Sequence, residues 1–298
     1  MSQLTRTQFE VLEIFASGDR SFSPKQPEAG TGGLPAEKIN GTVKELSRLG
    51  YIDDSEITPA GVSALEPYKV RRAVFFAAGF GSRMAPVTLN TPKPLVRVNG
   101  RRIIDGLIDS VLAAGINEIY IVRGYLSEQF DVLLNKYPMI KFIENTLYNT
   151  ENNISSAMCA RHLLENAYVL EADLLIDNPG IIRGYHYSSN FLGIKKRDSD
   201  DWCFTVENGI ITSQTIGGHD CYQEVGISYW DQADGKKLSE HIKAVYDMPG
   251  GRERYWDQVP FSFFPEEYRV GIRECFDEDI VEIDTFEELK AIDRSYDV

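Results

Sequence analysis

Continuous apolar runs alternate with longer amphipathic segments through the middle of the chain. Four runs have the length of strands, three of them with the pattern of strands buried on both faces of a sheet, and occupy residues 73–79, 118–124, 140–145 and 167–173. The segments between them place apolar residues at helical spacing and occupy residues 101–115, 127–137 and 153–166. Strands and helices that alternate with short loops predict right-handed βαβ units. We therefore expect an α/β fold with a Rossmann-like, doubly wound and mostly parallel sheet.

The first 68 residues have a different pattern. Apolar positions at helical spacing predict helices at residues 4–16 and 34–50, with Gly50 at the end of the second one. Residues 17–33 are rich in glycine, proline and serine and predict a loop. Residues 51–65 contain two short strand-like pieces around an acidic turn. This order of elements resembles a small winged helix-turn-helix module.

The two patterns predict two domains, a winged-helix-like domain at residues 1–68 and an α/β domain at residues 69–298. The first domain carries ten acidic and six basic side chains, and the whole chain has a formal net charge of −14. A protein that binds DNA needs a basic face for its phosphate contacts. The charge therefore weighs against nucleic acid as a partner, and it favours a structural or protein-contact role for the first domain.

The composition and the N-terminal sequence predict the cellular location of the protein. Its four cysteines include no C-x-x-C pair, and the N-terminus is polar rather than signal-like. No apolar stretch reaches the roughly 18 residues that a transmembrane helix needs. These features predict a reduced, cytoplasmic protein without a membrane span, and they are compatible with a homo-oligomer.

The sequence FFAAGFGSRM at residues 75–84 directly continues the first strand of the α/β domain. A side chain at Gly79 or Gly81 would obstruct a ligand that presses against main-chain N–H groups, so this turn can cradle a phosphate. It lacks the G-K-[ST] of a Walker A loop and the third glycine of a dinucleotide fingerprint. Two glycines after a strand can also form a plain tight turn, and the residues downstream decide between these interpretations.

The stretch AAGFGSRMAPVTLNTPKPLVRVNG, at residues 77–100, resembles the signature of nucleotidyltransferases of the nucleoside-diphosphate-sugar pyrophosphorylase type. The usual form of that signature is L-A-A-G-x-G-x-R followed by P-K-P-L, and Phe76 replaces its leucine with another apolar residue. The resemblance implies a loop that wraps the triphosphate of an NTP, with Arg83 and Lys93 as catalytic cations on the phosphates. Two cations suit this reaction, because an anionic oxygen must attack an anionic phosphorus.

Carboxylates near two strand ends are candidates for a Mg²⁺ site. Asp173 ends a buried-type strand, at a position where the same family carries a metal-binding aspartate. Glu282 and Asp284 alternate along a strand-like segment near the C-terminus, so they point to the same side. Mg²⁺ prefers a few carboxylates and keeps several waters. We therefore expect it at Asp173, Glu282 and Asp284, with Glu171 as a structural or supporting acid.

Further segments, among them VRGYLSEQFDVLLNKY, ENNISSAMCA and DIVEIDTFEEL, follow the order seen in the bacterial LicC-type CTP:phosphocholine cytidylyltransferases, to which residues 70–298 are similar. The resemblance implies CTP as the nucleotide and phosphocholine as the acceptor. An independent feature agrees with a choline-like acceptor. All three tryptophans lie between residues 202 and 256, and a trimethylammonium group is recognised by aromatic faces with negative charge nearby.

The expected binding residues follow from these patterns. For a choline cage we expect Trp202, Tyr255 and Asp257, with Trp256 and Tyr229 as further candidates. Strand alternation allows only one of Tyr229 and Trp230 to face a pocket, and some of these rings must fill the core instead. The expected nucleotide-binding residues are Ala77, Ala78, Gly79, Gly81, Ser82, Gly124, Tyr125, Asn153 and Ser155.

The sequence therefore predicts an enzyme that transfers CMP from CTP to phosphocholine by Mg²⁺-dependent in-line attack, giving CDP-choline and pyrophosphate. Three alternatives stay open. One is a cytidylyltransferase for another small acceptor such as 2-aminoethylphosphonate, whose primary ammonium needs carboxylates. The second is a sugar-1-phosphate nucleotidylyltransferase, which would use hydroxyl-binding side chains. The third is a transcription regulator that senses a nucleotide, although Arg83, Lys93, Asp173 and Asp284 favour catalysis.

Overall fold

The computed structural model describes residues 3–17, 35–54 and 56–297. The chain divides into two compact units: the first comprises Met1–Lys69 with Gly184–Tyr187, and the second comprises Val70–Arg183 with Ser188–Val298. Apart from Ser17, the loop that the sequence predicts at residues 17–33 lies outside the described residues.

The described part of the first unit contains α1 Arg6–Ser17, α2 Ala36–Arg48, β1 Ile52–Asp53, β2 Glu56–Ile57 and α3 Pro59–Leu65. The hydroxyl of Thr5 accepts a hydrogen bond from the N–H of Gln8 over 3.3 Å and so caps α1. Gly50 follows α2 with a φ of 74°, the left-handed conformation that ends many helices. Both helices and the short hairpin agree with the sequence pattern, and the winged-helix assignment stays a prediction.

The core of the first unit explains why Gly184–Tyr187, which are distant in sequence, belong to it. Leu12, Ile39 and Leu46 have no exposed surface, and the ring of Tyr187 stacks on that of Tyr68 with centroids 5.5 Å apart. Leu49, which follows α2 directly and is at helical spacing from Leu46, is 50% exposed. The buried face of this helix therefore runs through Ile39 and Leu46 and stops short of Leu49.

The second unit contains a seven-stranded sheet in the order β10-β12-β11-β8-β3-β6-β7. Its strands are β3 Arg72–Ala77, β6 Glu118–Arg123, β7 Lys141–Glu144, β8 Ala167–Glu171, β10 Asn190–Glu207, β11 Ile210–Trp230 and β12 Gly271–Cys275. Strands β8, β3, β6 and β7 run parallel, whereas β11 is antiparallel to β8. The predicted α/β fold with a mostly parallel central sheet is confirmed.

The remaining elements of this unit surround the sheet. Its described helices are α4 Ile103–Ala113, α5 Ile154–Ala160, α6 Gln232–Tyr246 and α7 Phe286–Ile292. Two short ladders pair β4 Arg97–Val98 with β5 Arg101–Arg102, and β9 Leu174–Ile176 with β13 Ile280–Glu282. The helix expected at residues 127–137 forms as a 3₁₀ helix, Ser127–Asn135.

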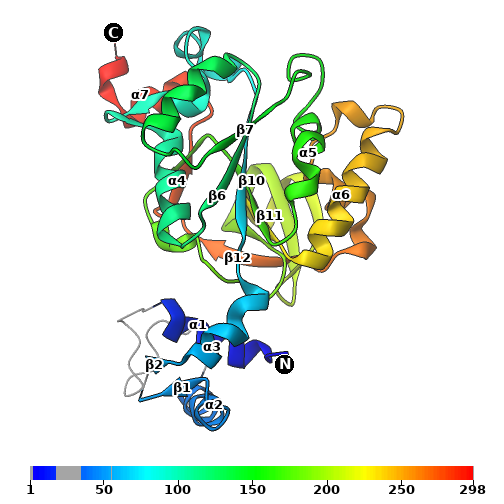
Figure 1. The fold of residues 1–298 in the computed structure, drawn as a ribbon. Coiled ribbons are helices and arrows are strands. Elements are labelled where there is room, and N and C mark those ends of the chain that lie inside the picture. The colour runs from blue at the N-terminus through cyan, green and yellow to red at the C-terminus, as the bar shows by residue number, and fades with distance from the viewer. Residues whose placement is uncertain (1–2, 18–34, 55, 298) are drawn as a thin grey trace. The chain divides into compact units, whose positions relative to one another are not determined.

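Alternate residues of β3 enter two separate cores. Phe75 packs with residues of α4 such as Leu107, and Phe76 packs with residues of α5 and α6 such as Ala157 and Leu238. Figure 1 shows α4 on one side of the sheet and α5 and α6 on the other. Because both faces of β3 are covered, the strand is apolar along its whole length, as its continuous apolar run predicts.

The strand order reverses at β3. The chain runs from β3 to β6 and β7 on one side, and then returns to β8 on the other side of β3. Ligands of doubly wound sheets bind beyond the carboxyl ends of the strands at such a reversal. The glycine loop directly follows β3, and Asp173 follows β8 by two residues.

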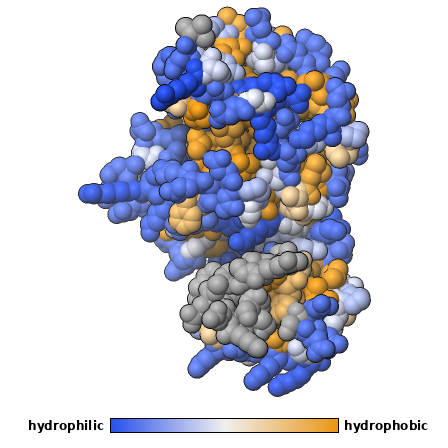
Figure 2. Space-filling model, turned by 90° about the vertical axis from the view of Figure 1, so that its left-hand side faces the viewer, coloured by the Kyte–Doolittle hydropathy of each residue, from blue (hydrophilic) through white to orange (hydrophobic). Residues whose placement is uncertain are grey.

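Hydrophilic residues predominate on the face drawn in Figure 2, with a strip of apolar residues exposed between them. Among the described residues, no helix combines the length and the apolar character that crossing a bilayer requires.

Candidate active site

The two glycines of the loop after β3 have different surroundings. Gly81 adopts a left-handed φ of 61°, and a Cβ at this position would lie 2.8 Å from the Cβ of Lys93. A Cβ at Gly79 would meet no described atom within 4 Å. Gly81 therefore allows the stem of Lys93 to pack against the loop, whereas Gly79 leaves space for a ligand.

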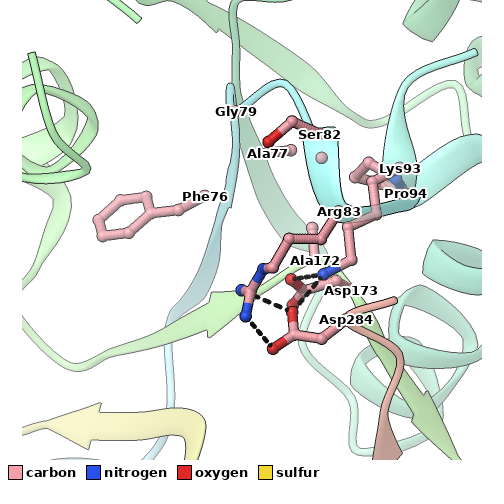
Figure 3. Close-up of a pocket in the computed structure, with 11 residues that line it drawn as sticks. Phe76, Ala77, Gly79, Ser82, Arg83, Lys93, Pro94, Ala172, Asp173 and Asp284 are labelled. Carbon is pink, nitrogen blue, oxygen red and sulfur yellow. Dashed lines mark hydrogen bonds and ion pairs between the residues drawn. The ribbon is translucent and has the colours of Figure 1, made fainter. Parts of the chain in front are cut away.

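Two cations and two carboxylates meet in a cavity of about 250 Å³ beside this loop. The Nζ of Lys93 lies 2.7 Å from Oδ2 of Asp173 and 2.8 Å from Oδ1 of Asp284. The guanidinium of Arg83 contacts both carboxylate oxygens of Asp284, each over 2.9 Å. Figure 3 shows the four side chains converging below the loop that carries Gly79 and Ser82. The signature residues Arg83 and Lys93 thus lie together although they are ten positions apart in the chain.

Burial distinguishes the two cations. Lys93 is 8% exposed, whereas the side chain of Arg83 is 68% exposed. Burial works to lower the pKa of Lys93, but the carboxylates of Asp173 and Asp284 outweigh it and raise this pKa. Lys93 is therefore a fixed, permanently charged group, whereas Arg83 is paired with Asp284 but still largely open to solvent.

A second group of carboxylates fits a divalent metal ion. Glu171, Asp173 and Glu282 each place one carboxylate oxygen within 4.8 Å of the others. In the part of the chain that the structure describes, Oδ1 of Asp173 is buried without a hydrogen-bond partner. Such an atom is costly unless a cation approaches it. Carboxylate oxygens are the protein ligands that Mg²⁺ prefers, so the chemistry of this group matches the expected ion.

The acids of this group repel one another. Burial, and after it the charge of Asp173, raises the pKa of Glu171 to about 8 and that of Glu282 to about 9. Asp284, expected as a metal ligand, lies outside this group of three and pairs with Lys93 and Arg83. Glu171, expected as a supporting acid, lies inside it. The ligand set Asp173, Glu282 and Asp284 stays a prediction, and Glu171 joins the candidates.

The aromatic residues expected around choline lie in several places. Tyr229 and Trp230 have no exposed surface and pack in opposite cores, so neither faces a pocket. Trp256 is 2% exposed in the second of these cores. Tyr229 and Trp256 were expected at a choline cage, but in the structure they pack inside the cores. A ring inside the core has no free face for a ligand. Trp202 and Tyr255 are accessible and contact each other edge to face, with centroids 5.8 Å apart.

Asp257 belongs to a polar cluster that the sequence analysis missed. It is 6% exposed and accepts a hydrogen bond from Nε2 of Gln214. The same Nε2 donates to Oε2 of Glu224 over 2.8 Å. Burial raises the pKa of Asp257 to about 6 and also raises the pKa of Glu224. The sequence could have indicated Glu224. Strand alternation places this acid on the same face as the buried Trp230, and an acid on a core-facing side of a strand is unusual.

A second cavity, of about 300 Å³, contains several of the expected nucleotide-binding residues. Ala78, Gly79, Asn153 and Ser155 line it, together with the metal-binding candidates Glu171, Asp173 and Glu282. Ala77, Gly81 and Ser82 line the first cavity instead. Asn145, which the sequence analysis missed, donates hydrogen bonds to the hydroxyls of Ser155 and Ser156 over 2.9 and 3.1 Å.

Gly124 and Tyr125, also expected at the nucleotide, line neither of these two cavities and contact residues near them instead. A Cβ at Gly124 would lie 2.7 Å from the ring of Tyr148, a residue that lines the second cavity. The hydroxyl of Tyr125 lies 3.1 and 3.0 Å from the carbonyl oxygens of Thr88 and Leu89. Gly124 thus allows a ring to lie close to the chain, and Tyr125 holds the segment between the glycine loop and Lys93.

Comparison with known proteins agrees with this geometry. The model of the nucleotidyl transferase family matches residues 72–186. A 2-aminoethylphosphonate cytidylyltransferase of Lancefieldella rimae is 37% identical over 228 residues, which are 75% of this chain and 92% of the relative. The chain belongs to the nucleotidyltransferase family. A choline-phosphate cytidylyltransferase of Streptococcus pneumoniae is 31% identical to this nucleotidyltransferase, over 75% of this chain and 97% of the relative.

A solved structure supports the same assignment. The CTP:phosphocholine cytidylyltransferase from Streptococcus pneumoniae has a TM-score of 0.70 and 28% identity to this nucleotidyltransferase, and the match covers 76% of this chain and 99% of that one. These relatives support cytidylyltransferase activity. They differ in the acceptor that their names give, which is 2-aminoethylphosphonate for one relative and choline phosphate for the other.

Proposed function

We propose that this nucleotidyltransferase transfers CMP from CTP to a small phosphoryl acceptor that carries a cationic amine. The observation that carries this proposal is a concentration of carboxyl groups around Lys93. The group comprises Glu171, Asp173, Glu224, Asp257, Glu282 and Asp284. The pKa values of Glu171, Glu224, Asp257 and Glu282 are raised, so these acids ionise readily only beside added cations. A divalent ion and a cationic acceptor would supply that positive charge, whereas the uncharged ring of a sugar phosphate would not.

The reaction is an in-line displacement. An oxygen of the acceptor's phosphate or phosphonate forms a bond to the α-phosphorus of CTP, the bond from that phosphorus to the β-phosphate oxygen breaks, and pyrophosphate leaves. Lys93 is held beside the carboxylates of Asp173 and Asp284, where a fixed charge can stabilise the α-phosphate. Arg83 is exposed and can accompany the departing pyrophosphate. The main chain around Gly79 offers N–H groups to the triphosphate.

Magnesium would be held by Asp173 and Glu282, with Glu171 or Asp284 as a further ligand. When bound, it would neutralise charge on the phosphates of the nucleotide. The orphaned Oδ1 of Asp173 supports this placement. The fold brings these acids together. Glu171 and Asp173 lie at the carboxyl end of β8, and Glu282 lies on the β13–β9 ladder, where it pairs with Leu174.

Two acceptors fit this proposal. 2-Aminoethylphosphonate is favoured by the buried Asp257 and the half-buried Glu224, because a primary ammonium needs hydrogen-bond acceptors as well as negative charge. Phosphocholine, the acceptor that the sequence predicts, is favoured by the accessible pair of Trp202 and Tyr255. Both compounds carry the phosphoryl oxygen that attacks and the cationic amine that the acids attract.

Pyrophosphate release across a matrix of the four NTPs and a set of acceptors tests the proposal. The acceptors are 2-aminoethylphosphonate, phosphocholine, glucose-1-phosphate and no acceptor. We expect turnover with CTP and one of the two amines, and none without an acceptor. Turnover with glucose-1-phosphate alone would overturn the proposal in favour of a sugar nucleotidyltransferase. Tight CTP binding without turnover in any combination would instead favour a nucleotide sensor.

A further inference from the structure

Gln214 is a buried amide that joins two acids. It lies on β11, is 8% exposed, and its Nε2 donates to Oε2 of Glu224 and to Oδ2 of Asp257. This arrangement uses both N–H donors of the amide. Among the described residues, Oε1 of Gln214 is buried and has no hydrogen-bond partner. A buried acceptor left without a donor is costly, so it indicates a missing donor.

This cluster lies next to the metal-binding candidates. Glu224 lines a cavity of about 250 Å³ together with Glu282 and Asp284. On the neighbouring strand, Glu171 packs so closely against Gly226 that a Cβ there would lie 2.8 Å from its side chain. Gly226 is two residues from Glu224 on the same face of β11. The cluster of Gln214, Glu224 and Asp257 therefore adjoins the site where the phosphoryl groups react.

We propose that Gln214, Glu224 and Asp257 bind the amine of the acceptor as a primary ammonium. This inference rests on the proposed function and selects 2-aminoethylphosphonate or a similar primary amine as the acceptor. A primary ammonium has three N–H donors, and the cluster offers it one orphaned amide oxygen and two carboxylates. A trimethylammonium group has no N–H to give, so it would leave Oε1 of Gln214 without a donor.

The aromatic residues agree with this choice. A cage for a quaternary ammonium needs several ring faces turned toward one point. Tyr229 and Trp256 are packed in the cores, and Trp202 and Tyr255 turn toward each other at an interplanar angle of 66°. One edge-to-face pair cannot enclose a trimethylammonium group, whereas an amide oxygen and two carboxylates are suitable acceptors for an ammonium.

The test compares two acceptors that differ only in methylation of the amine, 2-aminoethylphosphonate and its N,N,N-trimethyl derivative. With CTP and Mg²⁺, we expect the kcat/KM of the primary amine to exceed that of the trimethyl compound by at least about 100-fold, because a site built for N–H donors rejects an analogue without them. Equal values, or a preference for the trimethyl compound, would overturn the inference and leave the proposed function intact. No pyrophosphate release with either compound, or with phosphocholine, would overturn the proposed function itself.

Isosteric variants test the residues. Glu224→Gln removes one charge without changing the shape of the side chain, and Gln214→Met removes the amide. We expect each to raise the KM for 2-aminoethylphosphonate by about 10-fold or more, and to leave the KM for CTP within about twofold. Glu207→Gln, on an exposed residue of the same hairpin, is the matched control and should change neither value. An unchanged acceptor KM in folded Glu224→Gln would overturn the assignment, and this variant carries the test if Gln214→Met does not fold.

Discussion

Lys93 and Asp173 are 80 residues apart in the chain, yet the ammonium of one lies 2.7 Å from the carboxylate of the other. The contact joins the segment after the glycine loop to the carboxyl end of β8, across the point where the strand order reverses. Because Lys93 is almost fully buried, its charge cannot move far from this place. The pair therefore fixes a cation beside the carboxylates that fit a metal ion.

Replacing Lys93 with alanine should remove most of the activity. A preorganised charge in a water-poor site stabilises the charge that develops in the transition state, and its loss typically costs about 10²-fold in rate or more. We expect Lys93→Ala to lower kcat by at least that factor, measured as pyrophosphate release with saturating CTP and acceptor. Lys236→Ala, at an exposed position of α6, is the control. A near-normal kcat in folded Lys93→Ala would exclude Lys93 from the chemistry.

The two glycines of the loop should respond differently to alanine. At Gly81 the new Cβ meets Lys93 at 2.8 Å and the backbone has a positive φ, so Gly81→Ala should destabilise the protein by about 1–2 kcal/mol and lower its Tm. At Gly79 the new Cβ enters open space, so Gly79→Ala should keep its Tm and raise the KM for CTP by about 10-fold, since it would crowd a phosphate against the main chain. Thermal unfolding and steady-state kinetics on the same pair check both. Equal melting temperatures for the two variants would contradict the role of Gly81.

Single acid-to-amide changes should reveal which carboxylates hold the metal ion. We expect Asp173→Asn to lower kcat by about 10²-fold or more, because it removes the acid with the orphaned buried oxygen and a partner of Lys93. Glu171→Gln should mainly raise the Mg²⁺ concentration needed for half-maximal rate, by about 10-fold. Binding of Mn²⁺ followed by calorimetry without nucleotide gives a readout independent of turnover. Asp177→Asn, at an exposed acid after β9, should change neither quantity.

Asp284→Asn separates the two candidate ligand sets. If Asp284 acts through its ion pairs with Lys93 and Arg83, this variant should lower kcat while Mn²⁺ binds with nearly unchanged affinity. A loss of Mn²⁺ affinity as large as that of Asp173→Asn would instead support Asp284 as a ligand, as the sequence predicts.

Local patterns predicted four of the seven strands of the sheet, and the signature residues that lie beside its glycine loop. The apolar runs indicated the strands β3, β6, β7 and β8, and their parallel direction followed from the rules for βαβ units. Arg83 and Lys93 belong to one short signature, so their proximity needed no knowledge of distant contacts. The position of Asp173 followed from the end of its strand.

Residues that depend on distant pairing were harder to place. Glu171 joins Glu282 only because β13 pairs with β9, and that ladder spans more than a hundred residues of chain. Gln214 and Glu224 meet because the long hairpin of β10 and β11 doubles back, so that Phe204 pairs with both Gln214 and Tyr222. Aromatic composition could not distinguish a cage from a core, and burial decided the matter for Tyr229 and Trp256.

Replacing Asp257 should change stability in a pH-dependent way. Burial raises the pKa of Asp257 to about 6 in the folded chain, from about 3.9 in an unfolded one. The folded state therefore keeps a proton that the unfolded chain releases between these values. The stabilising contribution of that proton is complete below about pH 4 and is lost as the pH rises through 6. Asp257→Asn has no such titration, so without ligands it should lose less stability over this range than the natural protein does.

We expect Asp257→Asn to melt a few degrees above the natural protein at pH 7.5, which corresponds to about 2 kcal/mol or less, and the difference should shrink toward pH 4.5. Thermal unfolding at pH 4.5, 6 and 7.5, without CTP, metal or acceptor, measures it. Asp200→Asn, at an exposed acid on β10, should follow the natural protein at every pH.

The same Asp257→Asn variant should bind a cationic acceptor more weakly, because the charge that destabilises the free protein is the one that the acceptor needs. A variant that is less stable at pH 7.5, with a difference that grows as the pH rises, would show that a cation already compensates Asp257 in the free protein.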